Sequence, residues 1–140
     1  MAIVLSQIEN VMGEGIYDVV DVTDPDFLTS EVASIKEAGG DPILMKQGEN
    51  IKLMVSRLME KSFKQPIKML RLHGHGMPGL QSVSAGQGIL KPELSTVIST
   101  NDFKAIQNDL SRLKGYFSMA GEVFLMGCYV ADGEKGKKLL

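Results

Sequence analysis

Short apolar segments rich in β-branched residues alternate along this chain with longer segments in which apolar residues recur at helical spacing. β-Branched residues favour strands, and a spacing of three and four residues places side chains on one face of a helix. The pattern predicts four strands, at residues 16–22, 42–46, 67–72 and 123–126. It predicts helices at residues 25–38, 51–63 and from 100 or 101 to 117, with the start of another at 132–140.

Turn residues separate these elements. Asp24 and Pro25 suit the N-cap and first turn of the first helix, which Gly39 and Gly40 end. The segment 74–88 is rich in glycine, and Pro78-Gly79 marks a turn within it. We expect a small hairpin at residues 83–89.

The alternation of strands and helices predicts an α/β fold, with a mostly parallel sheet and helices on both faces. The later strands are almost continuous apolar runs, so we expect them to be covered on both sides. In such sheets the functional site lies beyond the carboxyl ends of the strands. His73-Gly74-His75-Gly76 follows the third strand and Gly127-Cys128 follows the fourth.

Composition narrows the classes of function. The 140 residues suit one domain, 1–140, and the net charge of −2 with a pI near 5.7 makes nucleic acid an unexpected partner. The apolar runs are too short to span a bilayer, and the brief segment 1–5 is a poor signal peptide. A single cysteine excludes an internal disulfide and fits a reducing compartment, or a thiol kept free for use.

The two strand ends together hold the groups that acyl transfer requires. A thiol attacks a carbonyl carbon as its thiolate, and a nearby imidazole can take the thiol proton and later give it to the leaving amine. Residues just past the ends of adjacent parallel strands can converge, because such strands lie about 5 Å apart. Glycines leave backbone N–H groups accessible to hold an oxyanion.

The residues around these strand ends resemble those of clan CD cysteine peptidases, the group of caspases, metacaspases, legumain, gingipain, clostripain, separase and the self-cleaving domains of bacterial toxins. Residues 70–79 (LRLHGHGMPG) resemble its apolar strand and His-Gly motif, and residues 123–128 (VFLMGC) resemble the strand that ends in the nucleophilic cysteine. Residues 129–136 are most similar to caspase-like domains of large bacterial surface and toxin proteins. Positions 75 and 128 are 53 residues apart, and in caspases the histidine lies about 50 residues upstream of the cysteine.

The resemblance implies a caspase-like three-layer sandwich and a cysteine endopeptidase with Cys128 as nucleophile and His75 as base. His73, which also precedes a glycine, is the alternate base. The amides of Gly76 and Cys128 would bind the oxyanion. The substrate would be a peptide or protein, the parent chain included, with no cofactor, no metal and no membrane. The resemblance places the chain in the cytoplasm or within a secreted effector or toxin.

Some features leave alternatives open. The sequence ends at Leu140, about where the large subunit of a caspase stops, so under this resemblance we expect a minimal version, a trimmed chain or a product of processing. The caspase signature around the cysteine is absent, so specificity for aspartate does not transfer. A non-catalytic caspase-like interaction module or scaffold is the alternative function. Asp24 and Asp26 could line a pocket for a basic side chain, although an N-cap is the simpler role for Asp24.

Two further readings of the same segments are weaker. His73 and His75 could bind zinc, but a zinc site needs three or four ligands, so Cys128 and a carboxylate would have to join them. The glycine-rich segment 74–88 lacks the Lys-Ser/Thr ending of a phosphate-binding loop.

Overall fold

The computed structural model describes residues 15–23, 25–101 and 103–127. The strands in these ranges are β1 (Ile16–Asp21), β2 (Ile43–Met45), β3 (Ile67–His73), β4 (Gly76–Met77), β5 (Leu80–Ser82), β6 (Val97–Ser99) and β7 (Phe117–Leu125). The α-helices are α2 (Pro25–Glu37), α3 (Ile51–Lys61) and α4 (Lys104–Ser111), and there are 3-10 turns η1 (Gly86–Leu90), η2 (Leu94–Thr96) and η3 (Lys114–Tyr116).

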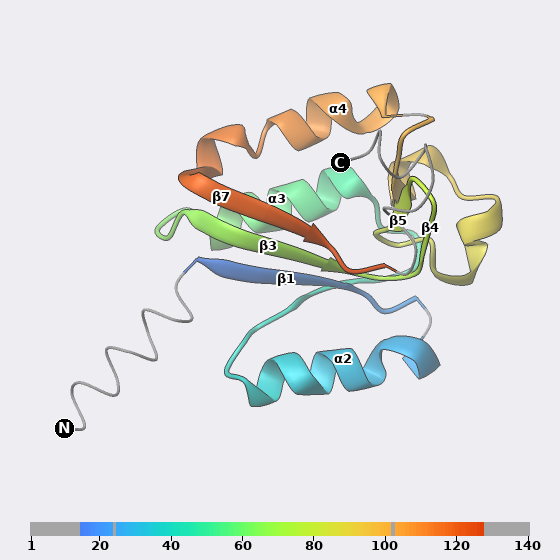
Figure 1. Cartoon of the computed structure of the whole chain (residues 1–140), viewed down its shortest axis with the longest axis horizontal. Coiled ribbons are helices and arrows are strands. Elements are labelled where there is room, and N and C mark those ends of the chain that lie inside the picture. The colour runs from blue at the N-terminus through green and yellow to red at the C-terminus, as the bar shows by residue number, and fades with distance from the viewer. Residues whose placement is uncertain (1–14, 24, 102, 128–140) are drawn as a thin grey trace.

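The main sheet has four strands in the order β2-β1-β3-β7, and every neighbouring pair is parallel. Helix α2 covers one face of this sheet, and α3 and α4 cover the other (Figure 1). The prediction of an α/β fold with a parallel sheet and helices on both faces is therefore confirmed. A second sheet, antiparallel in the order β4-β5-β6, lies beyond the end of β3.

The strand order reverses between β1 and β3, since β1 leads to β2 on one side and β3 leads to β7 on the other. Ligands of open parallel sheets bind at such a reversal, beyond the carboxyl ends of the strands. The β4-β5-β6 sheet stands at this end of the main sheet, so it forms part of any site there.

Helix α3 forms the centre of the core. Its residues Ile51, Met54, Val55 and Leu58 are buried against the sheet, as their spacing predicted. The side chain of Asn50 caps the helix by accepting a 3.0 Å hydrogen bond from the N–H of Leu53.

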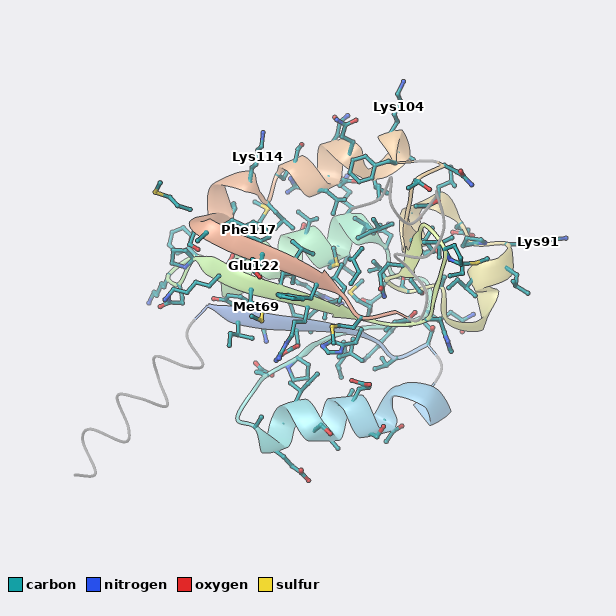
Figure 2. The ribbon with its side chains drawn as sticks, viewed as in Figure 1. Met69, Lys91, Lys104, Lys114, Phe117 and Glu122 are labelled. Carbon is teal, nitrogen blue, oxygen red and sulfur yellow. The ribbon has the colours of Figure 1, made fainter. Side chains whose placement is uncertain are left out.

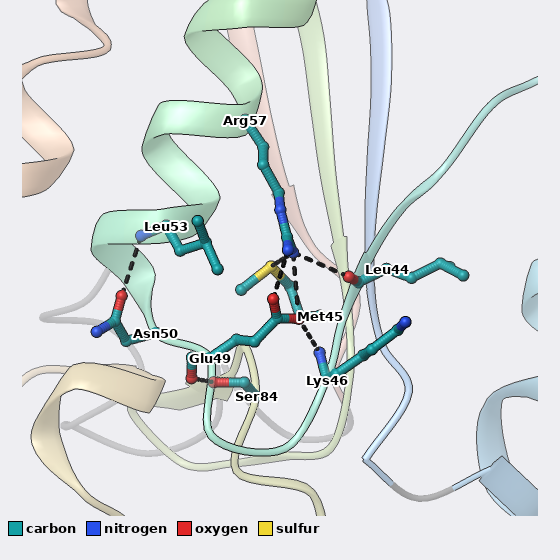
Figure 3. A network of polar contacts seen from close by, with 8 residues as sticks. All are labelled: Leu44, Met45, Lys46, Glu49, Asn50, Leu53, Arg57 and Ser84. Carbon is teal, nitrogen blue, oxygen red and sulfur yellow. Dashed lines mark hydrogen bonds and ion pairs between the residues drawn. The ribbon is translucent and has the colours of Figure 1, made fainter.

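An ion pair between Arg57 and Glu49 fixes the loop between β2 and α3 (Figure 3). Arg57 also donates a 3.2 Å hydrogen bond to the carbonyl oxygen of Leu44, and Glu49 accepts one of 2.7 Å from the N–H of Lys46. The hydrogen bond from Arg57 holds the pKa of Glu49 below its usual value. The Oγ of Ser84 donates a 2.6 Å hydrogen bond to the carbonyl oxygen of Glu49, which joins this loop to the segment after β5.

Three predictions about element boundaries are wrong. The predicted hairpin at residues 83–89 does not form, because β5 pairs with β6 at Val97–Ser99 and Gly86–Leu90 is a 3-10 turn. The third helix ends at Ser111, and Phe117 begins β7. Phe63 lies beyond the end of α3 with 79% of its surface exposed.

The prediction that the last strand is covered on both sides is also wrong within the described residues. There β7 pairs only with β3, and the side chains of Val123, Phe124 and Met126 are 50%, 39% and 52% exposed. Figure 2 shows the labelled side chains of this region, with Phe117 near the start of β7 and Glu122 further along it. Among the described residues, the apolar run of β7 therefore lies at the edge of the main sheet.

Candidate functional site

The segments that follow β3 and β7 come together, as expected for adjacent parallel strands. The last ladder contact is a 2.9 Å hydrogen bond from the N–H of Met126 to the carbonyl oxygen of Leu72. Beyond it, Gly127 packs on Gly76 so closely that a Cβ atom added to Gly127 would lie 2.8 Å from the Cα and 3.0 Å from the N of Gly76. The two residues in contact, Gly76 and Gly127, are the residue after His75 and the residue before Cys128.

The structure describes His75 of the predicted dyad but not Cys128. His75 is half-buried at the start of the β4-β5 hairpin, and its carbonyl oxygen accepts a 2.9 Å hydrogen bond from the N–H of Ser82. Cys128 lies outside the described residues, as do Asp24 and the predicted helix at 132–140. The pairing of His75 with Cys128 stays a prediction.

His73 occupies a different environment. It is 7% exposed, and its Nε2 lies 2.7 Å from Oδ1 of Asp18 on β1. Its Nδ1 lies 3.3 Å from Oε2 of Glu31 on α2, outside hydrogen-bond geometry. These contacts bury His73 among carboxylates on the α2 side of the sheet, which favours His75 over His73 as the base.

Asp18 is the centre of this cluster, which was not predicted from the sequence. Arg71 Nε and Nη2 donate hydrogen bonds of 2.7 and 2.8 Å to its two carboxylate oxygens. Burial alone would raise the pKa of Asp18, but the hydrogen bonds from His73 and Arg71 outweigh it and hold that pKa below its usual value. The same pairing raises the pKa of Arg71. A signal was present in the sequence, because Asp18 and Arg71 are opposite charges inside two apolar strands.

A second buried carboxylate fixes the loop after β5. Asp21, at the end of β1, is fully buried and accepts hydrogen bonds from Ser82 Oγ at 2.6 Å and from the N–H of Gly86 at 2.9 Å. It also accepts from the N–H and Oγ of Thr23 at 2.9 and 2.5 Å. Gly86 has φ +54°, and a Cβ atom there would lie 1.9 Å from Thr23 Oγ1, so only glycine fits.

The turn between β4 and β5 forms where the sequence predicted it. Gly79 has φ +73°, as the third residue of a type II turn requires, and Pro78 precedes it. At Gly74 an added Cβ atom would lie 2.6 Å from the carbonyl oxygen of Ser82. The small size of Gly74 therefore lets the hairpin fold back tightly against the end of β3.

Neither a metal site nor a membrane-spanning helix is found in the part of the chain that the structure describes. No group of three or more His, Cys, Asp or Glu side chains in residues 15–23, 25–101 and 103–127 is arranged to hold a metal ion. Within these ranges, no helix combines the length and the apolar character needed to cross a bilayer. The zinc hypothesis also requires Cys128, which is outside them.

Comparisons of the chain with protein-family models, with curated protein sequences and with solved structures found no match. The fold and the geometry of the site define an α/β domain in which polar and glycine-rich segments gather at the carboxyl end of a parallel sheet.

Proposed function

We propose that this chain is a caspase-like cysteine endopeptidase in which Cys128 is the nucleophile and His75 the acid/base. The Cys128 thiolate adds to the scissile carbonyl carbon, and the N–H groups of Gly76 and Cys128 stabilise the resulting oxyanion. The imidazolium of His75 then gives its proton to the leaving amine as the C–N bond breaks. Water hydrolyses the thioester, which returns the thiol and releases the carboxylate product.

The contact between Gly76 and Gly127 is the observation that supports this proposal most. An added Cβ atom on Gly127 would lie 2.8 Å from the Gly76 Cα, so there is no room between the two backbones for another group. Their neighbours in sequence are His75 and Cys128. A dyad needs nucleophile and base within reach of each other, and this contact keeps the two attachment points together.

The geometry of the hairpin supports Gly76 as an oxyanion donor. Ser82 donates from its N–H to the carbonyl oxygen of His75, and Gly76 pairs with Gln81. Hydrogen-bonded and non-hydrogen-bonded pairs alternate in an antiparallel ladder, so Gly76 is at a non-hydrogen-bonded position. Its N–H is therefore directed away from β5 and is not used by the β4-β5 ladder.

The finer fold is part of the same proposal. The parallel order β2-β1-β3-β7 with helices on both faces is compatible with a three-layer sandwich of the caspase kind. In that arrangement β3 ends at the histidine motif and the next strand of the main sheet, β7, leads to the cysteine.

We expect the chain to cleave members of a peptide library and Cys128→Ala to lower that cleavage about a thousandfold or more, because the nucleophile is lost. Cleavage products are identified by mass spectrometry, which also gives the residue preference on either side of the cut. The parent polypeptide is included as a substrate. Cleavage that persists in Cys128→Ala would contradict the assigned nucleophile.

A non-catalytic interaction module is the second candidate, and the exposed apolar side chains at the end of β7 favour it. An apolar cleft of about 360 Å³ lies between α4 and the sheet, with Phe103, Leu110 and Val123 among its lining residues. Phe103 and Val123 are 40% and 50% exposed. A module of this kind would leave every peptide of the library uncut.

A further inference from the structure

Gln81 is a fully buried amide at the centre of the small sheet. It is the middle residue of β5, where it pairs with Gly76 on one side and with Ile98 of β6 on the other. Burying an amide is costly unless its oxygen and nitrogen find partners, so the contacts of this side chain indicate why it is there.

The side chain of Gln81 joins the hairpin to the segment after β7. Its Oε1 accepts a 2.8 Å hydrogen bond from the N–H of Gly127, and its Nε2 donates one of 3.0 Å to the carbonyl oxygen of Ser82. Only one orientation of the amide satisfies both bonds, because Gly127 offers a donor and Ser82 an acceptor. An added Cβ atom on Gly127 would lie 2.7 Å from Oε1.

This hydrogen bond lies at the point where β7 has left the main sheet. Met126 still donates to Leu72 of β3, and the N–H of the next residue, Gly127, donates to Gln81 instead. Gln81 thus continues the restraint on the chain by one residue beyond the ladder. In sequence, the residue after Gly127 is Cys128.

We propose that Gln81 is a positioning residue that holds Gly127 against Gly76 and thereby sets the distance between the nucleophile and its base. This inference rests on the proposed function. A displacement of about 1 Å can cost about a hundredfold in rate, so one buried hydrogen bond at this point is enough to matter. Gln81 itself touches neither reacting group; it acts through Gly127.

The first test measures the bond itself. In the ¹⁵N-labelled full chain, Gln81→Met removes the acceptor for Gly127 while keeping the length of the side chain. We expect amide hydrogen exchange at Gly127 to quicken about tenfold or more, with the amide of Met126 as an internal reference that does not change. In Gln81→Glu a carboxylate oxygen still accepts from Gly127 but cannot donate to Ser82, so we expect Gly127 to stay protected.

The second test measures positioning through the thiol. Iodoacetamide labels Cys128 at a rate that depends on a nearby imidazole, so Gln81→Met is expected to slow labelling about tenfold and to shift the pH profile toward that of a free thiol, near pH 8.5. Gln81→Met combined with His75→Ala is expected to label no more slowly than His75→Ala alone, because both act on one interaction. Ser84→Ala, which removes the hydrogen bond of a buried side chain in the segment after β5, is the matched control with an unchanged rate.

The outcomes separate this inference from the proposed function. Unchanged exchange at Gly127 in Gln81→Met overturns the inference, whether or not the chain is a peptidase. The inference is also overturned if Gln81→Met exposes the Gly127 amide to exchange but labelling of Cys128 remains His75-dependent and as fast as in the wild type. If wild-type labelling does not depend on His75, the proposed function is wrong, and so is the role of Gln81 in positioning the nucleophile. The exchange data then still show whether Gln81 restrains Gly127. Urea unfolding of each variant shows that the fold is intact.

Discussion

Gly127→Ala is expected to lower Cys128-dependent cleavage about a hundredfold, because the added methyl group forces the two strand ends apart. Its Cβ would lie 2.8 Å from the Gly76 Cα and 2.7 Å from Gln81 Oε1, both closer than a Cβ atom approaches non-bonded atoms in folded proteins. The Gly76 backbone and a fully buried glutamine cannot give way without moving the hairpin. The segment that leads to Cys128 must therefore shift, and with it the distance to His75.

The same substitution is expected to lower the free energy of unfolding by about 1–3 kcal/mol, the usual effect of overpacking. Gly115→Ala is the matched control, since a Cβ atom there meets nothing within 4 Å. Peptide cleavage and urea unfolding measured on both variants separate a local effect from a general one. Gly127→Ala with wild-type cleavage would show that the contact with Gly76 does not matter for activity.

Asp18→Ala is expected to lower the free energy of unfolding by about 3 kcal/mol at pH 7. The substitution leaves Arg71 without its carboxylate partner and deprives His73 of its hydrogen bond at Nε2. The side chain of Arg71 is 36% exposed and can regain some hydration, which places the effect at the lower end of the range for broken buried pairs. Urea denaturation provides the measurement.

The pH dependence of that difference follows from the pKa of Asp18. Since the pKa of Asp18 is lowered on folding from the ordinary value of 3.8, its contribution to stability is present above that pH and is lost as the pH falls below it. The difference between wild type and Asp18→Ala should therefore shrink below about pH 4. Asp41→Asn is the control, because the side chain of Asp41, which forms an ion pair with Lys61, is 89% exposed. Loss of this ion pair should change the free energy of unfolding by no more than about 0.5 kcal/mol. An equally large loss at both positions would contradict the role of burial.

Local signals in the sequence predicted the parallel sheet and the convergence of the segments that follow β3 and β7. Helix α3 and strands β1 and β3 form where the sequence predicted them. Their signals are local, because the helical spacing of α3 (Ile51, Met54, Val55 and Leu58) and the apolar runs of β1 and β3 involve only residues close together in the chain. The meeting of Gly76 and Gly127 followed from strand adjacency alone.

Features that depend on distant pairing were missed. The predicted hairpin at residues 83–89 is wrong, because β5 pairs with β6. Strand β6 is only three residues long and begins fifteen residues after the end of β5, so the local sequence does not reveal this pairing. The buried cluster of Asp18, Arg71 and His73 requires knowing that β1 and β3 are neighbours in register. Gln81 looked like an ordinary polar residue in a loop, because its partner Gly127 is 46 residues away.

The rate at which iodoacetamide labels Cys128 at pH 6.5 tests the central claim most directly. A free thiol with a pKa of about 8.5 is only about 1% thiolate at that pH, whereas an imidazole in contact with it raises the reactive fraction. We predict labelling about tenfold faster or more in the wild type than in His75→Ala, after discounting the lower nucleophilicity of an acidic thiolate. Equal rates in the two proteins would contradict a His75–Cys128 dyad.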